Sequence, residues 1–281
     1  MKKLIGLLFV AFLTKITFAQ IPVPSQDNID KFLKTTTCIV YDANPMVSYN
    51  MKIKEAVEKY WKITPYKFIK ASEYEEMRKK PEYSFLTIDK VFFEKDKLKA
   101  QYEFLGVSLG GNYRSENDMP QIANIPLSYF GVDEESYVYK IPTLVQFLQH
   151  HVELIKSDPR LSTSNIKKYY NSKMKNTHDK TLYIVKDELS KDVNTEAKIK
   201  SVYPYPCIIT DRDALEEKIM NGEDILFLHK VGSEGTKRKA RCWIVIMNAK
   251  DAQIYYFNYH MIDGKHPDGI LLTDFKKLSK I

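Results

Sequence analysis

Short apolar runs alternate with amphipathic stretches in the first half of the chain, and this order predicts strands and helices in turn. Residues 37–41 form a short run rich in β-branched residues, which is typical of a buried strand. Residues 48–61 place five apolar side chains near one stripe at helical spacing, with lysines and glutamates opposite: Met51, Ala56, Val57, Tyr60 and Trp61. The pattern therefore predicts a buried strand followed by an amphipathic helix.

A second strand and helix follow, and then a third strand. The apolar run over residues 66–70 predicts the strand, and Ser72 and Glu75 have the spacing of a capping box, which predicts a helix start. This short helix is expected to end at Pro81, and residues 83–88 predict the third strand. Strands that alternate with helices need crossover connections, so these three strands are expected to pair in parallel.

The remaining apolar runs predict antiparallel strands. They cover residues 101–109, 121–130 and 135–141 in the first half and residues 240–248 and 252–262 in the second. Residues 248–253, "NAKDAQ", are typical of a polar turn between two such strands. Each half then closes on an amphipathic helix that follows a proline, Pro142 or Pro267.

One long phrase occurs twice in the chain. "TPYKFIKASEYEEMRKKPEYSFLTIDKV" (64–91) resembles "YPYPCIITDRDALEEKIMNGEDILFLHKV" (203–231), and one inserted residue aligns them when Pro65 is placed on Pro204. Upstream, "TCIVYD" (37–42) resembles "LYIVKD" (182–187). A repeat this long predicts a tandem duplication of a β-α-β-α-β-β-β-α unit, that is, an α/β fold with mixed (α+β) sheets. The expected organisation is a first repeat over 30–156, a polar linker over 157–180 that can hold a short helix at 166–175, and a second repeat over 181–281.

The first residues have the pattern of a secretory signal peptide. A basic start, Met1 to Lys3, precedes an apolar run from Leu4 to Leu13, and Thr17 and Ala19 are small residues before a cleavage site. We expect residues 1–19 to be removed, so that the mature chain begins at Gln20 and is exported to the periplasm or the extracellular space. No later apolar run approaches the roughly 20 residues that a membrane span needs, so the mature chain is expected to be soluble. An uncleaved anchor is the alternative.

Charge and cysteine content exclude two classes of protein. Removal of Lys2, Lys3 and Lys15 with the leader lowers the formal net charge from +7 by three, to +4, and the remaining basic residues are interleaved with acidic ones. A nucleic-acid partner is therefore not expected, because such a protein gathers its basic residues on one face. The three cysteines, Cys38, Cys207 and Cys242, do not make a disulfide framework and lie in strand-like runs, where they are expected to be buried. A bridge between the last two stays open.

Two aspartates are the strongest candidates for chemistry. Asp42 and Asp187 each follow the first strand of a repeat, at the edge where open α/β sheets bind ligands, and could hold a metal ion or a ribose. The alternative is structural, because aspartate is a common turn former and "DANP" (42–45) is a natural turn sequence. No glycine-rich phosphate loop follows either strand, and His229, His260 and His266 match no ligand spacing, so no cofactor is expected.

Aromatic residues are dense at "YYFNYH" (255–260). In a strand, Tyr256, Asn258 and His260 share one face, which would be a partner-binding platform if it is exposed. Helices that cover both faces of the sheet are the alternative.

The signal ending "FAQ", the phrase "NMKIKEAVEKYWKITPYKFI" and the run "YSFLTI" resemble exported proteins of the Bacteroidetes type. The resemblance covers most of the chain, implies export, and brings no catalytic motif. At the level of fold alone, the order of elements in each unit is similar to the small α/β domains of periplasmic assembly proteins, such as the TolB amino-terminal domain and the curli channel subunit.

The sequence favours a non-enzymatic binding or scaffold protein of the cell envelope, in which two related units form a composite interaction surface. The expected partner is an envelope or extracellular protein or a glycan. A G-x-S-x-G elbow is missing, and no cysteine has a motif neighbour that would activate it. The alternative is a hydrolase or a divalent-metal-dependent enzyme, with a site at the edge that carries Asp42 and Asp187 or in the cleft between the units.

Overall fold

The computed structural model describes residues 21–93, 96, 100–234 and 239–280, so the predicted leader (1–19) and the mature start at Gln20 lie outside the described residues. A short helix, α1 (Gln26–Phe32), precedes the first unit. That unit then contains β1 (Thr36–Val40), α2 (Ser48–Tyr60), β2 (Tyr66–Ile69), α3 (Ala71–Met77), β3 (Tyr83–Phe92), β4 (Gln101–Leu109), β5 (Gln121–Tyr129) and α4 (Ile141–Ser157).

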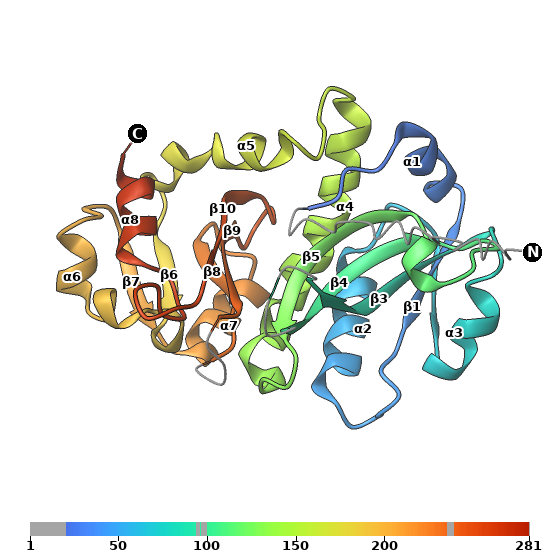
Figure 1. Ribbon diagram of the computed structural model, residues 1–281, viewed down its shortest axis with the longest axis horizontal. Helices are drawn as coiled ribbons and strands as arrows, with labels where there is room; N and C mark the ends of the chain where they lie inside the picture. The colour runs from blue at the N-terminus through green and yellow to red at the C-terminus, as the bar shows by residue number, and fades with distance from the viewer. Residues whose placement is uncertain (1–20, 94–95, 97–99, 235–238, 281) are drawn as a thin grey trace, which may run out of the picture.

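The second unit repeats this order of elements. It contains β6 (Leu182–Val185), α6 (Glu196–Lys200), β7 (Cys207–Thr210), α7 (Arg212–Met220), β8 (Leu226–Val231), β9 (Arg241–Asn248), β10 (Ile254–Met261) and α8 (Leu272–Ser279). Figure 1 shows the two units side by side, with the first at the right and the second at the left. The segment between them holds α5 (Ile166–Asn171) and a 3₁₀ turn, η4 (Met174–Thr177), as the helix-like run at 166–175 predicted.

The two sheets have the same topology. Each has five strands, in the orders β2-β1-β3-β4-β5 and β7-β6-β8-β9-β10. In both, the first three strands of the unit pair in parallel and the last two pairings are antiparallel. The predicted α/β fold in two similar units, each with a mixed sheet, is confirmed.

The register of the strands corrects the alignment of the two copies. The Thr37 amide donates to the carbonyl of Pro65 at 2.8 Å, and the Leu182 amide donates to the carbonyl of Pro206 at 3.0 Å. Pro65 is therefore equivalent to Pro206, whereas the repeated phrase placed it on Pro204. The tyrosine-proline pattern in the sequence favours Pro204 as the equivalent of Pro65. Strand pairing shows that the equivalent is Pro206, the residue directly before β7.

The helix α2 begins and ends close to the predicted positions but turns a different face to the core. Its buried residues are Tyr49, Ile53, Ala56 and Val57, whereas Met51 is 56% exposed. The predicted stripe was wrong at Met51, because the face that contacts α4 is centred on Ile53.

The predicted capping box at Ser72 and Glu75 was also wrong. The helix α3 has Lys70 as its N-cap, and Glu73 Oε2 accepts the Lys70 amide at 2.8 Å. Glu75 instead accepts a hydrogen bond from Arg78 Nε at 2.8 Å. The helix starts two residues earlier than the hydroxyl pattern predicts, because β2 ends at Ile69 and Lys70 directly after it is the N-cap.

Residues 135–141 were predicted as a strand, and the structure shows two 3₁₀ turns instead. These are η2 (Glu134–Ser136) and η3 (Val138–Lys140), and Asp133 caps the first by accepting the Glu135 amide at 3.1 Å. All three residues of η3 are buried. This connection between β5 and α4 reaches the second unit and becomes part of the candidate site.

The two units share one apolar core. Trp243 of β9 lies edge-on to Tyr102 and Phe104 of β4, with ring centroids 4.7 and 5.7 Å apart. Arg241 forms two hydrogen bonds with Asp96, at 2.9 and 3.0 Å, and its guanidinium lies 3.9 Å from the centre of the Phe93 ring. These contacts bury charged and aromatic groups between the units and hold them in one arrangement.

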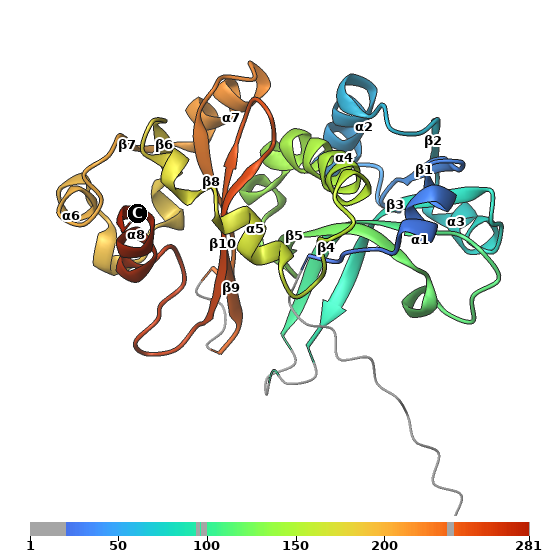
Figure 2. The same cartoon turned by 90° about the horizontal axis from the view of Figure 1, so that it is seen from above.

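The outer edge of the second sheet is covered by the segment between the units. Asn171 of α5 accepts the Phe257 amide at 2.7 Å and donates to the Phe257 carbonyl at 3.1 Å, and Figure 2 shows α5 beside β10. This pairing satisfies backbone groups that an edge strand would otherwise present for aggregation. Among the described residues, no helix is both long and apolar enough to cross a membrane.

Candidate functional site

The candidate site lies at the carboxyl ends of the parallel strands of the second sheet. Asp187 and Glu188 follow β6, Asp211 and Arg212 follow β7, and Lys230 is near the end of β8. Because β6, β7 and β8 are parallel, these ends meet at one edge, where ligands bind in open α/β sheets.

Two adjoining pockets lie along this edge. The larger, of about 640 Å³, is shallow and is lined by residues that follow β6 and β7, among them Asp187 and Arg212. The second, of about 350 Å³, is shared between the units, and we call it the seam pocket. Ser136 and Tyr139 of the first unit line it, together with six charged residues of the second unit: Asp187, Glu188, Arg212, Lys230, Glu234 and Asp268.

Glu188, which lines the seam pocket, forms a buried ion pair with a lysine of the first unit. Lys140, which is fully buried in η3, donates to Glu188 Oε1, and Glu188 is 7% exposed. Burial lowers the pKa of Lys140, and the carboxylate of Glu188 opposes that effect. The other carboxylate oxygen, Glu188 Oε2, is buried and has no hydrogen-bond partner among the described residues. Glu188 is therefore a half-satisfied acceptor at a pocket.

A second buried pair lies beside it. Lys230 Nζ contacts Asp268 Oδ2 at 3.2 Å, and the Lys230 amide contacts Glu188 Oε1 at 3.5 Å. Burial by itself would lower the pKa of Lys230, but the nearby charges of Asp268 and Glu188 outweigh it and raise that pKa. Asp268 lies close against Gly232, where an added Cβ would come within 2.0 Å of Asp268 Oδ1. Only glycine leaves room there for this carboxylate.

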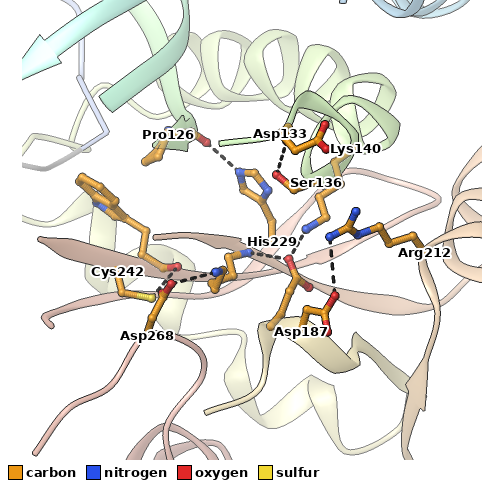
Figure 3. Close-up of polar contacts among 12 residues, drawn as sticks. Pro126, Asp133, Ser136, Lys140, Asp187, Arg212, His229, Cys242 and Asp268 are labelled. Carbon is orange, nitrogen blue, oxygen red and sulfur yellow. Dashed lines mark hydrogen bonds and ion pairs between the residues drawn. The ribbon is translucent and has the colours of Figure 1, made fainter. Parts of the chain in front are cut away.

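His229, on the opposite face of β8, stays neutral. Burial, and then the positive charge of Lys140, lower its pKa to about 3. Its Nε2 atom lies 2.7 Å from the carbonyl oxygen of Pro126, so Nε2 carries the proton and donates it to that oxygen. Figure 3 shows His229 pointing to Pro126 of β5 while Lys140 reaches toward the site from the first unit. His229 thus connects the two sheets without adding charge.

The amino-terminal end of α7 faces the same edge. Asp211 caps the helix by accepting the Ala214 amide at 2.8 Å. Arg212 is the first residue of the helix, and its Nη2 atom lies 3.7 Å from Asp187 Oδ2. This distance is short enough for an ion pair but too long for a hydrogen bond. Figure 3 shows the two side chains facing one another. Arg212 therefore keeps donor capacity next to the seam pocket.

The two predicted aspartates lie at equivalent places but in different surroundings. Asp187 lines both pockets, as the strand-end position predicts. Asp42 lines neither of them and accepts the Asn44 amide at 2.8 Å, the turn-forming role that was the alternative interpretation. In the part of the chain that the structure describes, no three His, Cys, Asp or Glu side chains are grouped so as to hold a metal ion. The structure does not bring Asp42 and Asp187 together at one site.

The predicted partner-binding face of β10 is largely covered. Tyr256 is 2% exposed and donates to Asp274 of α8 at 2.6 Å. Asn258 also donates to Asp274, at 3.0 Å, and His260 lies 3.0 Å from the Pro267 carbonyl. This face therefore matches the alternative of a covered sheet: Tyr256 is out of reach of a partner, and Asn258 and His260 are only partly exposed.

All three cysteines are free thiols. Cys207 on β7 and Cys242 on β9 are separated by β6 and β8, so three strand spacings, roughly 14 Å, lie between them. A disulfide needs Cα atoms within about 7 Å, which excludes a Cys207–Cys242 bridge in this arrangement.

Apart from Asp187, the charged residues at the seam pocket were not identified from the sequence. Lys140 lies in a run that was assigned to a strand, and Glu188 and Arg212 look like ordinary surface residues of a charged sequence. A useful signal was present at Lys140, a lone charge directly before the apolar helix over 141–157.

Comparison of the chain with protein-family models, with curated proteins and with solved structures finds no match.

Proposed function

We propose that the protein is an exported, non-enzymatic binding protein of the cell envelope, and that the seam pocket is its recognition site for a small polar ligand. The observation that carries the proposal is Glu188, a buried carboxylate with one unpartnered oxygen at a pocket lined by both units. Export is supported by the leader-like sequence, and the composite surface by the contacts between the units.

The energetics of the two buried pairs favour a functional role. Lys140 with Glu188, and Lys230 with Asp268, are removed from water at a cost that their attraction does not fully offset. A buried carboxylate oxygen without a partner adds to that cost. Apolar residues of similar size would stabilise the fold as well or better. A donor supplied by a ligand would satisfy the free oxygen of Glu188.

The difference between the two copies also points to the second unit. Glu188 follows Asp187, whereas Ala43 follows Asp42, and the first residue of α7 is Arg212, whereas that of α3 is Ala71. The strand register makes Lys230 equivalent to Ile88. The first unit has lost, or never had, the charged edge, and instead contributes Lys140, Ser136 and Tyr139 from its β5–α4 connection to its neighbour.

A hydrolase or a metal-dependent enzyme is the second candidate, because the pockets lie at the edge and between the units where that alternative places its site. Asp187 is the residue that supports it. The two candidates differ in outcome: a binding protein returns its ligand unchanged, whereas an enzyme releases a product.

The test compares the melting temperature of the mature protein with and without a small-molecule and glycan fraction from a bacterial envelope extract. We expect the fraction to raise the melting temperature of the wild type and of Arg160→Ala, an exposed control outside the site, and to have little effect on Arg212→Ala. Mass spectrometry of the fraction after incubation checks that no component is converted. Equal stabilisation of all three proteins would contradict a role for the seam pocket, and a converted component would favour the enzyme.

A further inference from the structure

We propose that the seam pocket binds a small zwitterion, a free amino acid or a short peptide, with the ammonium group near Glu188 and the carboxylate near Arg212. This inference rests on the proposed function and names its ligand class. It follows from the charge balance of the pocket, from its unpartnered groups and from its size.

The charge balance leaves room for one positive group. Glu188 and Asp268 are each paired with a buried lysine, Lys140 and Lys230. The other charged residues of the lining are Asp187, Glu234 and Arg212, so carboxylates exceed cations by one. The surrounding carboxylates favour an ammonium group beside Glu188, and an ammonium group can donate three hydrogen bonds. Glu188 Oε2 and Asp268 Oδ1 are buried acceptors of the lining that lack a donor among the described residues.

The opposite end of the site is suited to a carboxylate. Arg212 is 3.7 Å from Asp187, so its guanidinium can rotate to form the paired hydrogen bonds that carboxylates accept from arginine. It is also the first residue of α7, where backbone amides have no acceptor within the helix and the helix dipole favours a negative group. The acceptor at Glu188 and the donors at Arg212 line the same pocket, which favours a ligand that carries both charges.

The size of the seam pocket agrees with a small ligand. A volume of about 350 Å³ is at the lower end of the range for small-molecule sites, and it is too small for a folded partner. A neutral sugar would satisfy the acceptor at Glu188 but would bring no carboxylate for the donors of Arg212. The contacts therefore favour a zwitterion over a glycan.

The experiment measures binding of L-alanyl-L-alanine by calorimetry, together with two blocked analogues. N-acetyl-L-alanyl-L-alanine lacks the ammonium group, and L-alanyl-L-alaninamide lacks the carboxylate. We expect the unblocked dipeptide to bind and each analogue to bind at least about 10-fold more weakly, because one analogue leaves the buried Glu188 without a donor and the other leaves the half-buried Arg212 without a carboxylate. Equal binding of the dipeptide and both analogues would overturn the inference.

Variants of the protein assign each end of the dipeptide. Arg212→Ala is expected to weaken binding of the dipeptide at least about 10-fold but to leave the residual binding of the amide unchanged, because the amide has no carboxylate to lose. Glu188→Gln, which removes the negative charge assigned to the ammonium end, is expected to weaken the dipeptide and the amide by similar factors, because both carry the ammonium group. Arg160→Ala is the control and is expected to bind like the wild type. If Arg212→Ala weakens the dipeptide and its amide equally, the assigned orientation is wrong.

A neutral glycan probe separates failure of this inference from failure of the proposed function. If N-acetylglucosamine binds in a manner that depends on Arg212 and the dipeptide does not, the seam pocket is a recognition site but its ligand class is wrong. If neither probe binds and the envelope fraction stabilises wild type and Arg212→Ala alike, the proposed function and the ligand class both fail.

Discussion

Two buried histidines show how a single residue can link the fold to pH. His151 contacts the Tyr170 hydroxyl at 2.8 Å and the Pro22 carbonyl at 2.6 Å, and burial lowers its pKa to about 4. His229 is in the same situation, with a pKa of about 3. Between about pH 4 and pH 6.5 the folded protein keeps both rings neutral, whereas an exposed histidine would take up a proton. Acid therefore favours the unfolded chain.

The pH dependence is testable at His229. Its pKa is about 3 in the folded protein, whereas the ordinary value, taken for the unfolded chain, is 6.5. Below pH 6.5 the unfolded chain therefore binds a proton that the folded protein does not bind. The stability that the neutral ring contributes is present above pH 6.5 and is lost as the pH falls. We expect the advantage of wild type over His229→Gln, measured by urea unfolding, to decrease by about 2 kcal/mol between pH 7 and pH 5. An imidazole NMR titration near 6.5 would show that this assignment is wrong.

At the scale of elements, the two equivalent short helices begin in different ways. Asp211 caps α7 with its side chain, whereas α3 has no side-chain cap and relies on Glu73. Ser72, which looked like a cap in the sequence, is the second residue of α3. Both units thus have a helix at this place, but only α7 has a side-chain cap at its N-cap position.

Substitution of the two residues distinguishes the real cap from the apparent one. Asp211→Ala is expected to lower the free energy of unfolding by about 1 kcal/mol, because the Ala214 amide loses its acceptor. Ser72→Ala, the matched control, is expected to stay within about 0.5 kcal/mol of wild type. Chemical denaturation of both variants measures the difference. A larger loss for Ser72→Ala than for Asp211→Ala would reverse the assignment.

At the scale of the whole molecule, the interface between the units is part of the core rather than a surface contact. The core residues form a continuous cluster that includes α4 and β4 of the first unit and β8 and β9 of the second. Trp243, Arg241 and Lys140 all reach across this interface. Two units joined in this way are expected to unfold together.

Calorimetry of Arg241→Ala tests this coupling. Wild type is expected to show a single unfolding transition, and the variant is expected to be less stable by about 3–5 kcal/mol, because Asp96 is left buried without its cation. Arg160→Ala, which removes an exposed pair, is expected to change stability by less than about 1 kcal/mol. Two well-separated transitions in the wild type would show that the units are independent.

Much of the fold was predictable because local patterns and tertiary structure agree. The repeat is visible in the sequence itself. Apolar spacing alone predicts the helix at 48–60 and the strands at 101–109 and 121–129. The exposed Met51 and the N-cap of α3 are exceptions within the first unit, and a third exception lies where a segment meets the other unit. Residues 135–141 have the composition of a strand, yet residues 134–140 form η2 and η3, and Lys140 of η3 pairs with Glu188 of the second unit.

The candidate site was predictable only in part. The rule that ligands bind at the carboxyl ends of parallel strands located Asp187, but it applied equally to Asp42, which forms a turn. Nothing in the local sequence distinguishes Glu188 from other acidic residues, because its burial depends on Lys140, which lies 48 positions earlier in the chain.

The sequence by itself determined the order of strands and helices and the duplication, because periodic apolar spacing is a local property that each segment carries with it. Only the tertiary structure decided which of the two equivalent edges is charged and enclosed. That outcome depends on the β5–α4 connection of one unit lying against the strand ends of the other, and on lysine and carboxylate side chains leaving water together. Such long-range pairing has no counterpart in the spacing of residues along the chain.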